Sequence, residues 1–173
     1  MGNPARGATV NKRPLSDFEE KILANIAEHG CQVNTVFDPD GKEPTFSYSI
    51  GFPASVRQPE VIVFGLSRDL MHAMVNSLHH QCREGLQMRD GLVVNDLLEG
   101  HSCVLKYVLP ENIVDDFFAS ALWLARHRTG HKMDEAFQIV WPGAEQALFP
   151  WDDGCNEYVI EMQPALYRTE SVH

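Results

Sequence analysis

Several features that define other protein classes are missing from this sequence. No apolar run approaches the roughly 18 residues that a membrane span requires, and the opening segment MGNPARGATVNKRPL lacks the apolar core of a secretion signal. The glycine-rich loops GxxxxGK[ST] and GxGxxG and the GxSxG nucleophile elbow are also absent. We therefore expect a cytoplasmic protein without membrane contact, and no motif here indicates nucleotide binding or serine hydrolysis.

Cysteine and metal-ligand patterns are equally sparse. The four cysteines are far apart in the chain and form no CxxC pair, so we expect free thiols in a reducing compartment: Cys31, Cys82, Cys103 and Cys155. His79 and Cys82 would share a helix face with His72, but zinc needs three or four converging ligands and no further ligand is suitably spaced. The sequence therefore predicts no metal site and no cofactor.

Positive charge is in short supply. The chain carries 24 acidic and 14 basic residues, a formal net charge of -10. Such a field repels nucleic acid and anionic membranes and attracts cationic partners. The one short basic run, ARHRTGHK at 125–132, is typical of cations placed at a helix C-terminus, where the helix dipole favours them. We expect no nucleic-acid binding, whereas a cationic protein partner is compatible with the charge.

The length and local patterns predict one folded unit. A chain of 173 residues is most simply a single domain. Residues 1–14 combine Gly, Pro and Asn with basic residues and show no periodicity, which indicates a flexible N-terminal arm ahead of a domain at 15–173.

Three segments have the signals of helices. The first opens with the capping-box pair Ser16 and Glu19 and closes at Gly30. The second begins after Ser67, buries an apolar face and stops near Gly85. The third runs from about Pro110, which suits a first turn, to Gly130.

The remaining ordered segments read as strands. Residues 31–37 and 45–52 flank a turn-forming DPDGKEP and predict a hairpin. In the second of these strands, Phe46, Tyr48 and Ile50 alternate with serines, the pattern of a strand buried on one face. Further strands are expected at 60–66, 91–100, 101–109, 136–141 and 157–162. Because helices and strands mix without regular βα alternation, we predict an α+β domain with a mainly antiparallel sheet and about three helices.

The segment FQIVWPGAEQALFPWDDG holds the most unusual chemistry. Trp141 and Trp151 each adjoin a proline, so each large ring stands on a backbone with little freedom to lose. Two interpretations stay open: the rings cover the edge of the core, or they form the wall of a pocket. Asp152 and Asp153 either cap a turn or face a cationic or hydroxylated ligand. The acidic neighbours of Cys155 should raise its pKa and keep that thiol unreactive.

The segments FSYSIGF, PEVIVFGL, LLEG and FQIVWPGAEQALFPWD, in this order and spacing, resemble the bacterial domain-of-unknown-function family 4262. The resemblance runs from about residue 30 to residue 153. This sequence departs from the family pattern at Gln58, where a His is usual, and at Gly143, where an acid is usual. The resemblance implies a shared fold and one constellation rather than a reaction: Tyr48, Gly51, Glu60, Trp141, Pro142, Phe149, Pro150, Trp151 and Asp152.

Three functions remain open at this point. The first is a binding module whose small ligand lies between Tyr48, Trp141 and Trp151, with Asp152 or Glu60 as the polar anchor. The second is an acidic, immunity-like protein that binds a cationic partner. The third is an enzyme that uses a carboxylate as general acid or base, for which the pKa would have to lie near neutrality.

Overall fold

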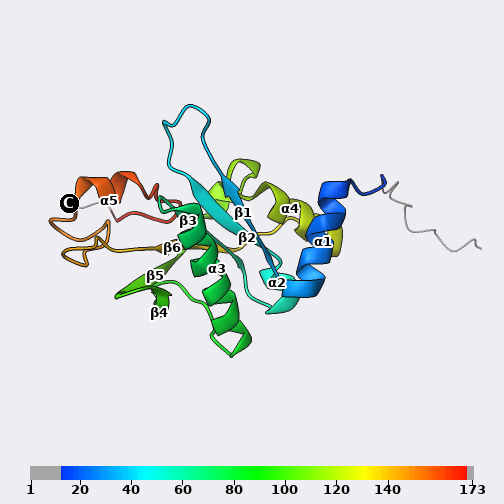
Figure 1. Ribbon diagram of the computed structural model, residues 1–173, viewed down its shortest axis with the longest axis horizontal. Helices are drawn as coiled ribbons and strands as arrows, with labels where there is room; N and C mark the ends of the chain where they lie inside the picture. Colours follow the sequence, from blue (N-terminus) through cyan, green and yellow to red (C-terminus); the bar gives the residue numbers. More distant parts are fainter. Residues whose placement is uncertain (1–12, 171–173) are drawn as a thin grey trace, which may run out of the picture.

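The computed structural model describes residues 13–170 and shows a single α+β domain (Figure 1). The predicted arm at 1–14 lies almost entirely outside these residues. Within residues 13–170, three long helices and two short ones accompany six strands, so the predicted fold class is confirmed. In chain order the elements are α1 (Asp17–His29), β1 (Gln32–Val36), β2 (Phe46–Ile50), α2 (Phe52–Ser55), β3 (Glu60–Phe64), α3 (Arg68–Arg83), β4 (Val93–Leu98), β5 (His101–Tyr107), the 3-10 turn η1 (Pro110–Asn112), α4 (Asp115–Thr129), β6 (Ala136–Val140) and α5 (Glu157–Glu161).

The six strands form one sheet in the order β1-β2-β3-β6-β5-β4. All neighbours are antiparallel except β3 and β6, which are parallel. Hairpins join β1 to β2 and β4 to β5. The parallel pair in the centre requires a long crossover, which passes through α3, the β4–β5 hairpin and α4. Within the described chain, β1 and β4 are the two edges of the sheet.

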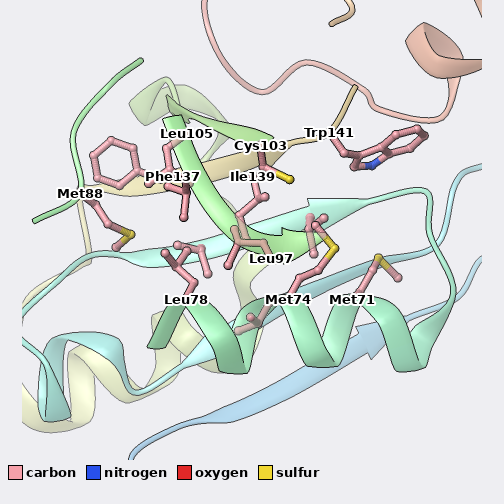
Figure 2. Packing of buried hydrophobic residues seen from close by; sticks show 14 of the residues in the cluster. Met71, Met74, Leu78, Met88, Leu97, Cys103, Leu105, Phe137, Ile139 and Trp141 are labelled. Carbon is pink, nitrogen blue, oxygen red and sulfur yellow. The ribbon is translucent and has the colours of Figure 1, made fainter. Parts of the chain in front are cut away.

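Helices cover both faces of the sheet. On one face α3 packs over residues from β3, β5 and β6 (Figure 2). On the other, residues of α1 and α4 pack against β2 and alternate positions of β3. Along β3 the two clusters take alternate residues, as Val61 and Ile62 illustrate.

Burial on both faces corrects one prediction. The alternation of Phe46, Tyr48 and Ile50 with serines suggested that β2 has a solvated side, but all five of its residues are buried. Ser47 and Ser49 lie under the α3 layer, where hydrogen bonds satisfy their hydroxyls. A hydroxyl that is internally satisfied costs little to bury, so serine in a strand does not always mark a solvent-facing side.

The predicted helix caps are confirmed at the first two long helices. The Ser16 hydroxyl accepts a hydrogen bond from the Glu19 amide at 3.1 Å, and the Glu19 carboxylate accepts one from the Ser16 amide at 3.0 Å. Gly30 ends α1 with φ 89°, the left-handed conformation that favours glycine. Ser67 caps α3 through the Leu70 amide.

Two boundaries differ from the predictions. Pro110 opens the separate 3-10 turn η1, and α4 itself begins at Asp115. The segment 157–162, which was expected to be a strand, forms the short helix α5 instead. Its short apolar run at 158–160 is compatible with a strand, but the Asn156 side chain accepts a hydrogen bond from the Tyr158 amide at 2.8 Å and starts a helical turn.

Candidate functional site

Tyr48, the first predicted site residue, is part of the core beneath α4. Its hydroxyl accepts hydrogen bonds from the Ser120 amide at 3.0 Å and from the Asn34 side chain at 3.2 Å. Its ring meets Phe118 edge-on, with the ring centres 6.1 Å apart. The hydroxyl and the ring of Tyr48 therefore both have their partners within the protein.

Trp141 lies on the other side of the sheet. It belongs to the cluster beneath α3, at one end of the group drawn in Figure 2. Its indole N–H donates to the Phe64 carbonyl at 2.7 Å, and the Gln163 amide side chain bonds both its backbone N–H and its C=O. Because Tyr48 and Trp141 occupy opposite faces of the sheet, the prediction that they line one pocket is wrong.

Trp151 is a surface residue, with 45% of its area exposed. Its ring stacks on Phe149 at 5.1 Å with an interplanar angle of 4°, and Tyr167 meets it edge-on at 5.9 Å. The Lys106 ammonium lies 5.4 Å from the centre of the Trp151 ring. Of the two interpretations, core cover holds for Trp141, whereas Trp151 forms part of an aromatic surface.

Asp152 organises the turn that carries Trp151. Its carboxylate accepts a hydrogen bond from the Phe149 amide at 2.9 Å, and its own amide donates to the Phe149 carbonyl at 2.9 Å. This is the turn-capping alternative. Nearby, burial and then the Asp152 charge raise the pKa of the Cys155 thiol, the direction that the sequence predicted.

Glu60, at the start of β3, is a buried carboxyl with only 2% of its area exposed. It accepts hydrogen bonds from the Ser49 hydroxyl at 2.8 Å and from the amides of Gly51 and Phe52 at 2.8 and 3.0 Å. These contacts fix the turn between β2 and α2. Burial raises the pKa of Glu60 to about 7, while the three hydrogen bonds and the more distant Arg128 charge act in the opposite direction.

Glu60 also borders a cleft of about 360 Å³, which we call the Glu60 cleft. Three segments enclose it: the residues around α2 and the start of β3, the C-terminal half of α4, and the loop that leads into β6. In Figure 1, α2 and α4 lie toward the same end of the molecule as α1. The lining residues are Pro53, Arg57, Gln58, Pro59, Glu60, Ala121, Leu124, Ala125, Arg128, Thr129, His131, Lys132, Met133, Asp134 and Glu135.

The charges of the Glu60 cleft distinguish it from the molecule as a whole. Arg57, Arg128 and Lys132 are exposed at its lining and form an ion pair with none of residues 13–170. Asp134 and Glu135 are exposed in the same lining. A chain of net charge -10 therefore has here a site in which cations match or exceed carboxylates.

The sequence contained a signal for this cleft that its interpretation missed. The basic run at 125–132 does provide cations for the last turn of α4, as predicted. However, Arg128, His131 and Lys132 of the same run also line the cleft. A second signal is Gln58, where the family resemblance implies a His. It is buried in the cleft wall and accepts a hydrogen bond from the Met88 amide at 3.0 Å.

The three buried cysteine thiols have raised pKa values, which disfavours the reactive thiolate form. Burial raises the pKa of Cys31 and Cys103 to about 12 and that of Cys82 to about 11. Across residues 13–170 no three His, Cys, Asp or Glu side chains come together as a metal-binding group. No helix in this part of the chain combines the length and the apolarity that crossing a bilayer demands.

The comparisons with known proteins identify the family. The model of the domain of unknown function DUF4262 matches residues 25–156, and the chain therefore belongs to this family. No curated protein matches the chain, and no solved structure matches it. The matched span includes Tyr48, Glu60, Trp141, Trp151 and Asp152, together with the whole lining of the Glu60 cleft.

Proposed function

We propose that this protein is a cytoplasmic binding module that takes a small organic molecule in the Glu60 cleft. The observation that carries the proposal is the combination of apolar walls with cations that the described chain leaves without ion-pair partners. Ligand sites are typically concave and mostly apolar, with a few polar groups that fix orientation. The smallest have volumes of about 300 Å³. The cleft, at about 360 Å³, suits a compact ligand.

The lining favours a molecule with an apolar body and an anionic group. Leu124 and Met133 offer apolar contact, and Arg57, Arg128 and Lys132 are exposed at the lining. A guanidinium can bind a carboxylate through two parallel hydrogen bonds, which gives both energy and orientation.

Binding is better supported than catalysis. A carboxyl with a pKa of about 7 is suited to acid–base chemistry, which favours an enzyme. However, both oxygens of Glu60 already accept hydrogen bonds from the β2–α2 turn, and the side chain is almost fully buried. A general base must reach the proton that it removes, so this arrangement favours a structural carboxyl beneath a binding site.

The test is an NMR titration of isotope-labelled protein with benzoate and, as the uncharged counterpart, benzyl alcohol. We expect benzoate to shift the amide signals of Leu124, Arg128 and Met133, and to bind more tightly than the alcohol. Arg128→Gln should weaken benzoate binding several-fold because a surface charge partner is lost. Arg126→Gln is the matched control, since Arg126 lies in the same helical turn but not in the cleft lining. Equal shifts with both probes, or shifts confined to other surfaces, would contradict the proposal.

A second candidate function is the binding of a cationic partner protein. It is favoured by the surface around α5, where Trp151, Tyr158 and Ile160 are exposed among Asp153 and neighbouring acidic residues. This surface lies at the opposite end of the molecule from α1 (Figure 1). A labelled oligolysine peptide should shift amide signals at 151–161, and Tyr158→Ala should weaken that binding. A response spread evenly over all acidic residues would instead indicate non-specific attraction.

A further inference from the structure

The strand β1 is an open edge of the sheet. Among residues 13–170 it pairs only with β2, through an uninterrupted register from Gln32 opposite Ile50 to Val36 opposite Phe46. Successive residues of an antiparallel strand direct their backbone groups alternately to either side. Alternate N–H and C=O groups of β1 therefore point away from β2, and none of them bonds another backbone group of the described chain.

The other edge is built differently. The pairing of β4 with β5 shifts register between Val94 and Leu98, and Asp96 adopts φ 65° within the strand. Such irregularities twist an edge and prevent another strand from pairing with it. By contrast, the β1 sequence Gln-Val-Asn-Thr-Val contains no charged residue and no proline, the usual protections of an edge strand. Only one of the two edges is thus able to accept a strand.

A groove follows this open edge. It has a volume of about 1060 Å³ and is bounded by residues of α1 on one side and α3 on the other, with β1 between them. Figure 1 shows α1 next to β1. We call it the edge groove; its lining consists of Phe18, Lys21, Asn25, His29, Cys31, Gln32, Val33, Asn34, Thr35, Val36, Phe37, Arg68, His72 and Asn76.

Among residues 13–170, the lining of the edge groove includes no acidic residue, although the full sequence has 24 of them. Lys21 and Arg68 are exposed there, one from each flanking helix, and neither forms an ion pair with residues 13–170. Two large apolar rings are exposed as well: Phe18 has 57% of its area accessible and Phe37 has 59%. The groove therefore offers backbone hydrogen bonds, apolar contact and positive charge together.

We propose that the edge groove binds an extended acidic segment of a partner protein, which adds to the sheet as a strand next to β1. Backbone hydrogen bonds along β1 supply the pairing, and Lys21 and Arg68 select carboxylate side chains from the two sides. A second copy of this chain is the less favourable occupant, because two antiparallel β1 strands would bring two sets of the same cations together.

The probe is a capped octapeptide in which pairs of glutamates alternate with pairs of valines, so that both faces of the added strand carry carboxylates. It is titrated into isotope-labelled protein. We expect shifts in the amide signals of residues 32–36 and slowed hydrogen exchange at alternate positions of β1. A lysine–valine peptide of the same length should bind at least tenfold more weakly. A glutamate–valine peptide N-methylated at every residue should not bind, because it keeps the charge but loses the N–H groups of both its edges, which strand pairing requires.

Matched variants separate the groove from the overall charge. Lys21→Glu combined with Arg68→Glu should weaken the glutamate peptide about tenfold. Arg89→Glu combined with Arg126→Glu changes the net charge equally at exposed positions outside the edge groove and should leave binding unchanged. The proposal is overturned if the glutamate peptide leaves residues 32–36 unaffected at millimolar concentration, or if both double variants respond alike. It is also overturned if sedimentation shows a dimer that Lys21→Glu and Arg68→Glu disrupt.

Discussion

Replacing Glu60 by glutamine tests the most unusual electrostatic feature of this protein. Glutamine has the same shape and keeps one acceptor oxygen, but it carries no charge and cannot titrate. Its amide nitrogen replaces one carboxylate oxygen, and the donors to that oxygen lose their acceptor. These are the Gly51 amide if Oε2 is replaced, or the Ser49 hydroxyl and the Phe52 amide if Oε1 is replaced. A buried donor without a partner costs about 1–3 kcal/mol, and this cost does not depend on pH.

The pH-dependent part comes from the carboxyl itself. Its pKa rises from 4.5 to about 7 on folding, and each unit corresponds to about 1.4 kcal/mol, so the total is about 3 kcal/mol. Because the folded state holds the proton more tightly, the stabilisation is fully present below the unfolded pKa of 4.5 and is lost as the pH rises through about 7.

The difference in the free energy of unfolding between wild type and Glu60→Gln isolates this effect, because the contributions of the other ionisable groups cancel. Glu19, for example, has its pKa lowered to about 2 by Arg13 and the helix cap, and its stabilisation is lost only as the pH falls toward that value. The free energy of unfolding of wild type minus that of Glu60→Gln should fall by about 3 kcal/mol between about pH 4 and about pH 8. At low pH the wild type should be the more stable protein, and at high pH the difference should vanish or reverse.

Urea denaturation followed by circular dichroism across this pH range measures the difference directly. Glu145→Gln, at an exposed position, is the control and should track the wild type at each pH. A flat difference between wild type and Glu60→Gln would refute the reasoning, because it would mean that the carboxyl titrates alike in the folded and unfolded states.

The remaining predictions concern packing. Gly65→Ala should lower the free energy of unfolding by several kcal/mol, because its new methyl would lie 2.5 Å from the Met162 carbonyl oxygen. Gly100 has a similar φ but open space around it, so Gly100→Ala should cost only about 1 kcal/mol. Thermal unfolding of both variants measures the difference. Equal costs would contradict the steric argument. Tyr48→Phe should lower the free energy of unfolding by about 1–3 kcal/mol, since the donors to its hydroxyl lose their acceptor. Trp151→Ala should cost less than Trp141→Ala in the same urea assay, because Trp151 is 45% exposed and Trp141 only 5%; an equal cost would place Trp151 in the core.

Local sequence signals predict most of the helices and strands correctly. The capping box at Ser16, the left-handed glycine at Gly30 and the cap at Ser67 each act within a few residues, so the sequence predicts them directly. The error at 157–162 has a local cause too. A short apolar run such as 158–160 is compatible with either a strand or a short helix, and the Asn156 cap decides between them.

The arrangement of the site depends on relations that local patterns do not contain. Tyr48 and Trp141 were grouped because both are aromatic and lie in motif-rich strands. Which face each ring takes depends on the register of β2 and β6 in the sheet, and a shift of one residue would exchange the faces. The Glu60 cleft likewise joins segments about 70 residues apart, which only the parallel pairing of β3 with β6 brings together.

The same pairing links the buried carboxyl to the proposed ligand. Glu60 lies opposite Ala136 in the register, so the turn that it holds and the loop entering β6 face one another across the cleft. An anion bound near Arg128 would reduce the influence of the positive charge that lowers the pKa of Glu60. Binding of such a ligand should therefore raise this pKa further and be accompanied by proton uptake near neutral pH. Calorimetric titration of benzoate in two buffers of different ionisation enthalpy measures that uptake. Glu60→Gln should abolish it while leaving the cations of the cleft in place, and proton release in the wild type would mean that the anion binds elsewhere.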